Sequence, residues 1–307
     1  MASQKNLFLN QEENSLEKDK AKHALEQLFS LARKYRTGKA FFELIKFVTH
    51  FRFYSPFNAM LVHVQMPHAR FATSAQRWAS RYGYVIKPSA RPLVILQPMG
   101  PVMFVFDVSD VEPGPHALPL PPDVTMPFEV RGGHIGKELD LLFENCKRDR
   151  IEIDLKKEGA PSAGSIKLVE IGKYKPQNVY KGKDQDGRAV FVKIPVQYWM
   201  IVNEGMSRES QFVTVLHELA HLYCGHLGTP NPKWWPDRQG LSHEIREVEA
   251  ESVAHLVSGR LGIDNASEKY LSGFINSEKD IPEISFDCML KAAGLIEQMC
   301  RKKLKPR

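Results

Sequence analysis

The sequence predicts an α+β protein, with a mostly helical N-terminal domain that contains a β-hairpin and a second domain that combines a small sheet with helices. Three observations support this fold class. Apolar residues recur at helical spacing between about residues 11 and 66, and two short β-rich runs flank a turn at 98–101. Six prolines lie within residues 113–127. Because proline resists both helix and sheet, this stretch indicates a semi-rigid connector between two domains.

The composition is that of an ordinary globular protein. The chain has 307 residues, of which 43% are hydrophobic and 25% charged, enough for two compact domains. Its net charge of +6 permits a nucleic-acid partner without indicating one. The four cysteines lie far apart without a CxxC pair, which excludes a disulfide framework and a four-thiolate zinc site. No signal-peptide core and no run of ~20 apolar residues is present, so we expect a cytoplasmic protein without a membrane segment.

The N-terminal domain, residues 1–112, is expected to be helical up to residue 66. Pro56 is expected to begin the third helix of this region, because its missing N–H costs nothing in the first helical turn. The helix would end before Pro67, which cannot continue it. A shorter helix is expected at 72–82.

Two apolar runs, 92–96 and 102–106, are rich in β-forming residues and are separated by turn residues, so we expect them to pair as the hairpin. The linker is placed at 113–128 and the second domain at 129–307. Apolar periodicity and glycine or serine boundaries predict helices in the second domain at 137–148, from Ser207 to before Gly225, and at 244–261, 267–276 and 285–303. Runs of β-forming residues predict strands at 151–155, 165–171, 189–194 and 198–202.

A histidine pair on one of these helices carries the strongest functional signal. The segment reads His217-Glu218-Leu219-Ala220-His221. Residues four apart share a helical face, so His217 and His221 can point both imidazoles at one metal ion. Glu218 lies one residue further round, where it can take a proton from water and pass it to a leaving group. Chance would produce this pattern roughly 0.03 times in such a chain, and the apolar flanks disfavour the alternative of two surface histidines.

A catalytic zinc ion needs a third protein ligand and an open position for water. A third histidine in the pattern HExxHxxGxxH is excluded, because Cys224 and Leu227 occupy its glycine and histidine positions. His226 comes one residue too early, and we expect it either at the surface or behind the ligands.

A glutamate on the following helix is the other option. Residues 246–257 carry three glutamates among apolar residues, and buried carboxylates need partners. Glu247 and Glu251 share one face, whereas Glu249 lies about 200° round from Glu247. We therefore expect Glu247 to bind zinc and Glu251 to accept an N–H from a ligand histidine, with an exposed helix glutamate as the alternative for each. Three candidates stay open as donors to the oxyanion of a hydrolytic reaction: His243, His255 and Tyr223.

These motifs resemble a known group of proteins. The histidine segment followed by residues 246–254 resembles the ImmA/IrrE-type zinc metallopeptidases and the related ArdC-like antirestriction proteins. Their third zinc ligand is a glutamate three residues before an alanine, which corresponds to Glu247 before Ala250. The segment 267–271, with Phe274 beyond it, is also similar to the end of such domains.

The N-terminal half extends the resemblance to nearly the whole chain. Residues 54–61 and 65–67, followed by Trp78 and Gly83, are similar to the ArdC-type N-terminal domain. That domain is associated with binding of single-stranded DNA.

The resemblance implies a zincin-like second domain and a zinc-dependent endopeptidase that cleaves a protein or peptide substrate. Zn²⁺ would be held by His217, His221 and Glu247, with Glu218 as general base and then acid. The alternative is a single-stranded-DNA-binding antirestriction or mobile-element protein in which the zinc is structural. That function would use aromatic side chains that stack on bases, and the candidates are Phe51, Phe53, Tyr54 and Trp78.

Overall fold

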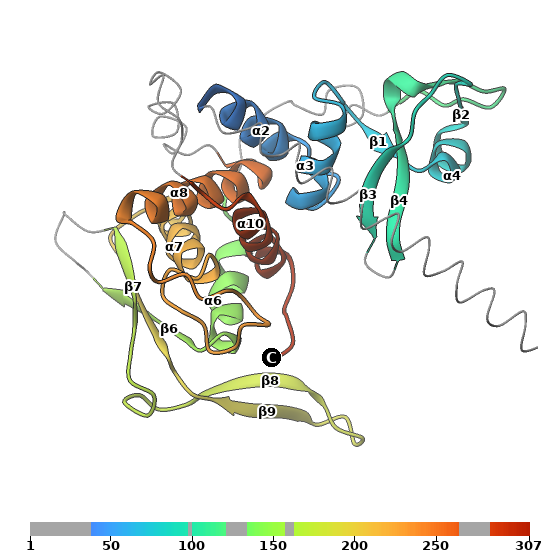
Figure 1. Ribbon diagram of the computed structural model, residues 1–307. Coiled ribbons are helices and arrows are strands. Elements are labelled where there is room, and N and C mark those ends of the chain that lie inside the picture. Colours follow the sequence, from blue (N-terminus) through green and yellow to red (C-terminus); the bar gives the residue numbers. More distant parts are fainter. Residues whose placement is uncertain (1–37, 98–99, 121–133, 157–162, 264–282) are drawn as a thin grey trace, which may run out of the picture. The chain divides into compact units, whose positions relative to one another are not determined.

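The computed structural model describes residues 38–97, 100–120, 134–156, 163–263 and 283–307 (Figure 1). Several predictions lie outside these ranges: the helical pattern before residue 38, part of the hairpin turn, the second half of the linker, and the helix at 267–276 with the family-like segment that it contains. Helices and small sheets together make a mixed α+β fold, which confirms the predicted class at that level. The described residues fall into two compact units, one that ends at residue 120 and one that begins at residue 134.

The first unit pairs two helices with a hairpin. Helix α2 spans Gly38–His50, and α3 spans Pro56–Gln65, with the Ser55 side chain accepting the N–H of Asn58 at its start. Strands β3 (Leu93–Gln97) and β4 (Gly100–Asp107) form the predicted antiparallel hairpin.

Two amide side chains of α3 attach the helix to β3. Asn58 both donates to the carbonyl of Leu96 and accepts its N–H, at 3.0 and 2.9 Å. Gln65 forms the same two-way pair with Val94, at 2.9 Å each. The amides thus bond the strand backbone as a neighbouring strand would.

The predicted helix at 72–82 is wrong at its start. Ala72–Thr73 form strand β1, which pairs antiparallel with β4. The helical part begins only after Ser74, whose hydroxyl accepts the N–H of Arg77 as a cap, and consists of α4 (Ala75–Arg77) and the π-helical turn η1 (Trp78–Tyr82). The cap and the β-branched Thr73 explain the later start.

The beginning of the stretch predicted as a semi-rigid connector is part of the first unit. A short helical turn, η2 (Val108–Asp110), leads into strand β5 (Val111–Pro113), which pairs with β2 (Tyr84–Ile86). The N–H of Leu118 then donates to the carbonyl of Tyr82. Proline is tolerated at this edge because its ring nitrogen has no ladder partner to lose.

The second unit is built on a three-stranded sheet. Strand β10 (Tyr198–Asn203) lies in the middle, parallel to β6 (Ile151–Lys156) and antiparallel to β7 (Gly164–Leu168), which is an edge strand. Alternate residues of β10 are buried, as expected for a half-buried strand: Tyr198, Met200 and Val202. Helix α6 (Glu138–Arg148) precedes β6 and packs against it.

A separate hairpin joins β8 (Gln177–Lys183) to β9 (Ala189–Ile194). Strand β8 was not predicted from the sequence. Only Val179 of its seven residues is buried, and its lysines and glycine give no alternating apolar pattern.

Three further helices complete this unit, and each begins with a serine cap. They are α7 (Arg208–Tyr223), α8 (His243–Arg260) and α10 (Phe286–Arg301). Helix α7 packs against β7, β10, α8 and α10, so its apolar residues lie in the centre of the unit (Figure 1). All four cysteines are free and buried. Among the described residues, no helix has the length and apolar character of a membrane span.

Candidate metal centre

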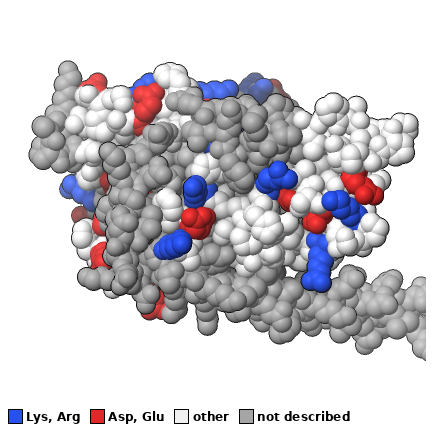
Figure 2. Space-filling view, turned by 90° about the horizontal axis from the view of Figure 1, so that it is seen from above, with Lys and Arg blue, Asp and Glu red and all other residues white. Residues whose placement is uncertain are grey.

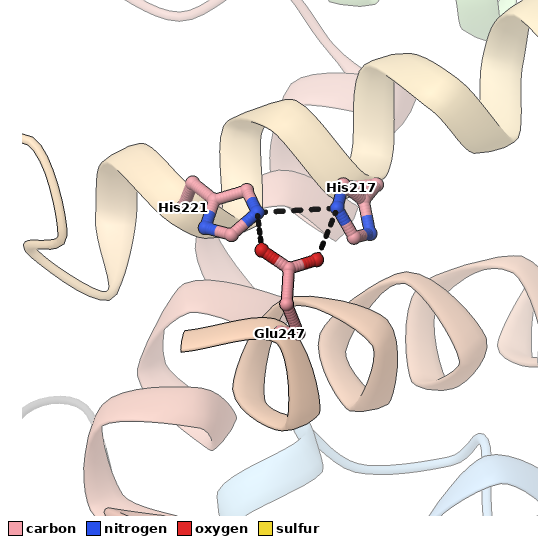
Figure 3. Close-up of side chains that lie close together, drawn as sticks. All are labelled: His217, His221 and Glu247. Carbon is pink, nitrogen blue, oxygen red and sulfur yellow. Dashed lines mark hydrogen bonds and ion pairs between the residues drawn. The ribbon is translucent and has the colours of Figure 1, made fainter. Parts of the chain in front are cut away.

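Helix α7 places the two predicted histidines side by side. Leu216, Leu219 and Leu222 are fully buried and seat the helix in the core. His217 and His221 are half-buried on the side that faces α8, with their Nε2 atoms 3.1 Å apart (Figure 3). A buried helix holds these side chains more rigidly than a loop would.

Glu247 reaches the same point from α8. Its Oε2 lies 3.5 Å from Nε2 of His217 and its Oε1 lies 3.5 Å from Nε2 of His221, so the carboxylate faces both imidazoles (Figure 3). Ligand atoms around a tetrahedral zinc ion lie about 3.3 Å apart, because each lies about 2.0–2.1 Å from the metal. The two imidazole nitrogens and the facing carboxylate therefore have a spacing close to that of ligands around a zinc ion, with one donor atom from each residue within 4.8 Å of the others.

Glu251 fixes the tautomer of His217. Its Oε2 lies 2.9 Å from Nδ1 of His217, so Nδ1 donates to Glu251 and Nε2 is the ring nitrogen that faces Glu247. Burial lowers the pKa of His217, but the hydrogen bond to Glu251 and the charges of Glu218 and Glu251 outweigh it, leaving the pKa above its ordinary value. This is the role predicted for Glu251.

His221 is oriented through a second histidine. Its Nδ1 lies 2.9 Å from Nδ1 of His226, and Nε2 of His226 lies 2.9 Å from Oε2 of Glu249. Since the carboxylate accepts from Nε2 of His226, Nδ1 of His226 accepts from His221, which leaves Nε2 of His221 as a lone pair. Burial, together with the charges of His217 and His226, lowers the pKa of His221 to about 3, which keeps the ring neutral.

Nε2 of His217, Nε2 of His221 and the Glu247 carboxylate converge on one point. A metal ion there would take the place of the proton that the raised pKa of His217 favours, and two imidazoles with one carboxylate suit zinc. The residues therefore fit a zinc ion and leave a fourth position for water or substrate.

Glu249 is the carboxylate that accepts the hydrogen bond from His226, and it is fully buried. Arg238 donates to both of its oxygens, at 2.6 and 2.7 Å, and the N–H of Ser285 donates at 2.7 Å. Burial raises the pKa of Glu249, but the bonds from His226 and Arg238 outweigh it and hold the pKa below its ordinary value. Sequence reasoning placed Glu249 on another face of α8 and missed this role, because Arg238 lies in a loop without periodicity.

Cys224, His226 and Glu249 also bring one donor atom each within 4.8 Å. Here, however, the Arg238 guanidinium already neutralises the carboxylate, and the imidazole makes a complementary hydrogen bond on each side. This cluster is satisfied without an ion, so it is a supporting network rather than a second metal centre.

The predicted base, Glu218, is half-buried on α7 beside the histidines. Burial raises its pKa, the nearby His217 and a backbone hydrogen bond from Ile166 lower it, and the charge of Glu247 raises it, so that the pKa lies above its ordinary value. A raised carboxyl pKa suits a group that must both accept and return a proton.

The three candidates for an oxyanion donor differ in position. Tyr223 is excluded, because its buried hydroxyl donates to Asp149 at 2.8 Å. His243 has a side chain that is 79% exposed and lies 3.4 Å from Oε1 of Glu247, at the rim of the centre. His255 is half-buried further along α8.

The aromatic residues considered for DNA stacking lie mostly in the core of the first unit. Phe51 and Trp78 are fully buried, and the indole of Trp78 donates to the carbonyl of Phe106 at 2.9 Å. Tyr54 donates to the carbonyl of Ala72 at 3.0 Å, whereas Phe53 is 43% exposed. Phe51 and Trp78 therefore cannot stack on bases in this fold.

Comparison of the chain with protein-family models, with curated proteins and with solved structures gave no match. The resemblance to the ImmA/IrrE-type and ArdC-like proteins thus stays a prediction that rests on the quoted motifs.

Proposed function

We propose that this protein is a zinc-dependent metallo-endopeptidase that hydrolyses peptide bonds in a protein substrate. One observation carries the proposal: the Nε2 atoms of His217 and His221 converge with the Glu247 carboxylate at zinc-like spacing, next to the half-buried Glu218. A structural zinc site has four protein ligands, whereas three with an adjacent glutamate is the arrangement of a hydrolytic centre.

Bound zinc would supply Lewis acidity to the attacking water and to the substrate carbonyl. Glu218 accepts the proton of the attacking water and then returns it to the amine that leaves. Glu251 and His226 hold the two imidazoles in the tautomer that faces the centre.

The position of β7 at the edge of the sheet is the reason to propose a peptide as the substrate. This strand pairs only with β10 among the described strands, and its residue Ile166 donates a backbone hydrogen bond to Glu218. An extended peptide can add to such an edge through main-chain hydrogen bonds. A segment bound there would lie beside Glu218 without requiring a chain terminus, which favours cleavage within a chain.

The function is tested by separating metal binding from catalysis. Purified wild-type protein and Glu218→Gln are expected to contain zinc at one ion per chain, and His217→Ala is expected to lose it. In cells, only wild type should produce new peptide termini in the proteome, compared with Glu218→Gln. Identical termini in both samples would show that the zinc site is not proteolytic.

A further inference from the structure

The second unit contains a cavity of about 620 Å³ on a different set of elements from the metal centre. The connection between α6 and β6, the β8–β9 hairpin and the last residues of the chain form its walls, and the C-terminal end lies beside β8 in Figure 1. The volume lies within the range of roughly 300–1,000 Å³ that small-ligand sites occupy.

Every charged side chain in the cavity wall is a cation. The remaining wall residues are aliphatic, proline or Trp234, and the cations are Arg148, Arg150, Lys181, Lys193, Lys305 and Arg307. The face that Figure 2 shows is different, because Lys and Arg there are interspersed with Asp and Glu on the described residues. The cavity is therefore a local concentration of positive charge in the described part of the chain.

One buried carboxylate compensates only part of this charge. Asp149 accepts from Nε of Arg307 at 2.6 Å and from the hydroxyl of Tyr223 at 2.8 Å. Nε of Arg148 lies 3.3 Å from the same carboxylate but finds no hydrogen-bond partner among the described residues, although Arg148 is only 9% exposed. A buried guanidinium on the wall of a cavity, with an Nε atom that has no hydrogen-bond partner, favours an anion that completes its environment.

Arg150 stands at the same wall in an unusual conformation. Its φ of 68° lies in the left-handed region, where glycine or asparagine is usual, and its carbonyl accepts from the N–H groups of Gln197 and Tyr198. Its guanidinium lies 5.7 Å from the ring centre of Trp234, and that of Arg307 lies 5.4 Å from it. The fold thus keeps an arginine where a smaller residue would be less strained, and holds two guanidinium groups around one indole.

We propose that this cavity binds a compact polyphosphorylated small molecule, such as an inorganic polyphosphate or a nucleoside triphosphate. Six cations against one carboxylate match a ligand with several negative charges better than a single phosphate ion. A volume of this size suits a compact ligand better than an extended nucleic-acid strand. The site is independent of the proposed peptidase activity, because it shares no residue with the metal centre.

The test is binding of inorganic tripolyphosphate to the full chain, measured by calorimetry and by tryptophan fluorescence, since Trp234 lines the cavity. Lys181→Ala/Lys193→Ala removes two exposed cations of the wall. Lys175→Ala/Lys183→Ala is the matched control, because these lysines are equally exposed in or next to the same hairpin but do not line the cavity. Thermal unfolding of each variant verifies the fold.

We expect saturable binding of one tripolyphosphate per chain. The wall variant should weaken it by about tenfold or more and the control by less than about twofold. Orthophosphate should bind much more weakly, and ATP should compete. Equal losses in the two variants, or orthophosphate binding as tight as that of tripolyphosphate, would overturn the proposal, as would binding of single-stranded DNA that tripolyphosphate cannot displace.

Discussion

At the scale of single residues, the two metal-facing histidines are oriented by different means. His217 donates directly to Glu251, whereas His221 donates to His226, which in turn donates to Glu249. Both connections serve the same end, because each places the ring proton on Nδ1 and leaves Nε2 free for a metal ion.

Replacement of His226 by alanine is expected to weaken zinc binding by about 10–100-fold, because His221 loses the acceptor that fixes its tautomer. Competition with a chelator of known affinity measures the change. His134→Ala is the control, since the side chain of His134 is 86% exposed and pairs only with Glu209 among the described residues. An unchanged zinc affinity in His226→Ala would show that this connection does not support the centre.

Arg238→Met is expected to reduce the free energy of unfolding by about 3 kcal/mol, because it leaves the fully buried Glu249 without its cation. Arg238→Lys should recover part of the loss. Urea unfolding at neutral pH measures both variants. Equal stability of Arg238→Met and wild type would mean that Glu249 gains no net stabilisation from the pair.

Part of this site was predictable and part was not. The pairing of His217 with His221 on α7, and of Glu247 with Glu251 on α8, follows from helical spacing, so each pair could be predicted from the sequence. The partners of Glu249 come from a loop and from the start of α10, and their approach depends on tertiary packing that no period in the sequence encodes.

At the scale of elements, apolar periodicity, with Ser207 at the start of α7 and Gly262 after the end of α8, predicted the helices that carry the site. Elements without such signals were missed or misplaced: β8 is largely polar, and the β2–β5 pair uses residues of a proline-rich stretch. The strand order of the sheet was also not predictable, because β6 and β10 are distant in sequence and their pairing is set by packing of α6 and α7.

The turn after α7 requires a glycine at residue 225, because a side chain there would clash. Gly225 has a φ of 83°, and a Cβ there would lie 2.2 Å from the carbonyl oxygen of Pro236. The same approach lets the N–H of Arg238 donate to the carbonyl of Gly225 at 2.8 Å, which positions the loop.

Gly225→Ala is therefore expected to destabilise the protein by about 3 kcal/mol and to weaken zinc binding, because Arg238 and His226 both shift. Gly228→Ala is the comparison. It has a similar φ of 76°, but its Cβ would meet the flexible end of Gln239. Urea unfolding that ranks the two variants equally would contradict the role given to the close approach.

At the scale of the whole molecule, the metal centre lies in the second unit, and the first unit has a pH-sensitive group of its own. The first unit contains a buried histidine, His63, which packs 4.7 Å from the ring of Phe47. Burial lowers the pKa of His63 from 6.5 to about 4, against a smaller opposing effect of a hydrogen bond that the ring donates to the backbone carbonyl of Pro67. The folded unit thus favours the neutral ring.

The stability that follows from this shift is complete above pH 6.5 and is lost as the pH falls toward 4, because the unfolded chain then binds a proton that the folded unit resists. The loss is expected to reach roughly 3 kcal/mol. Hydrogen exchange of residues 38–66 in the full chain measures it. His63→Leu should remove this pH dependence, while His68→Gln, at an exposed position, should retain it.

The central claim is that two histidines and one glutamate hold zinc in the second unit. X-ray absorption at the zinc edge of the purified full chain tests it most directly. The predicted spectrum has two imidazole nitrogens and oxygen neighbours at about 2.0–2.1 Å, and this signal disappears in Glu247→Ala/His217→Ala. A zinc–sulfur distance of about 2.3 Å would contradict the claim, because it would place the metal at Cys224 instead.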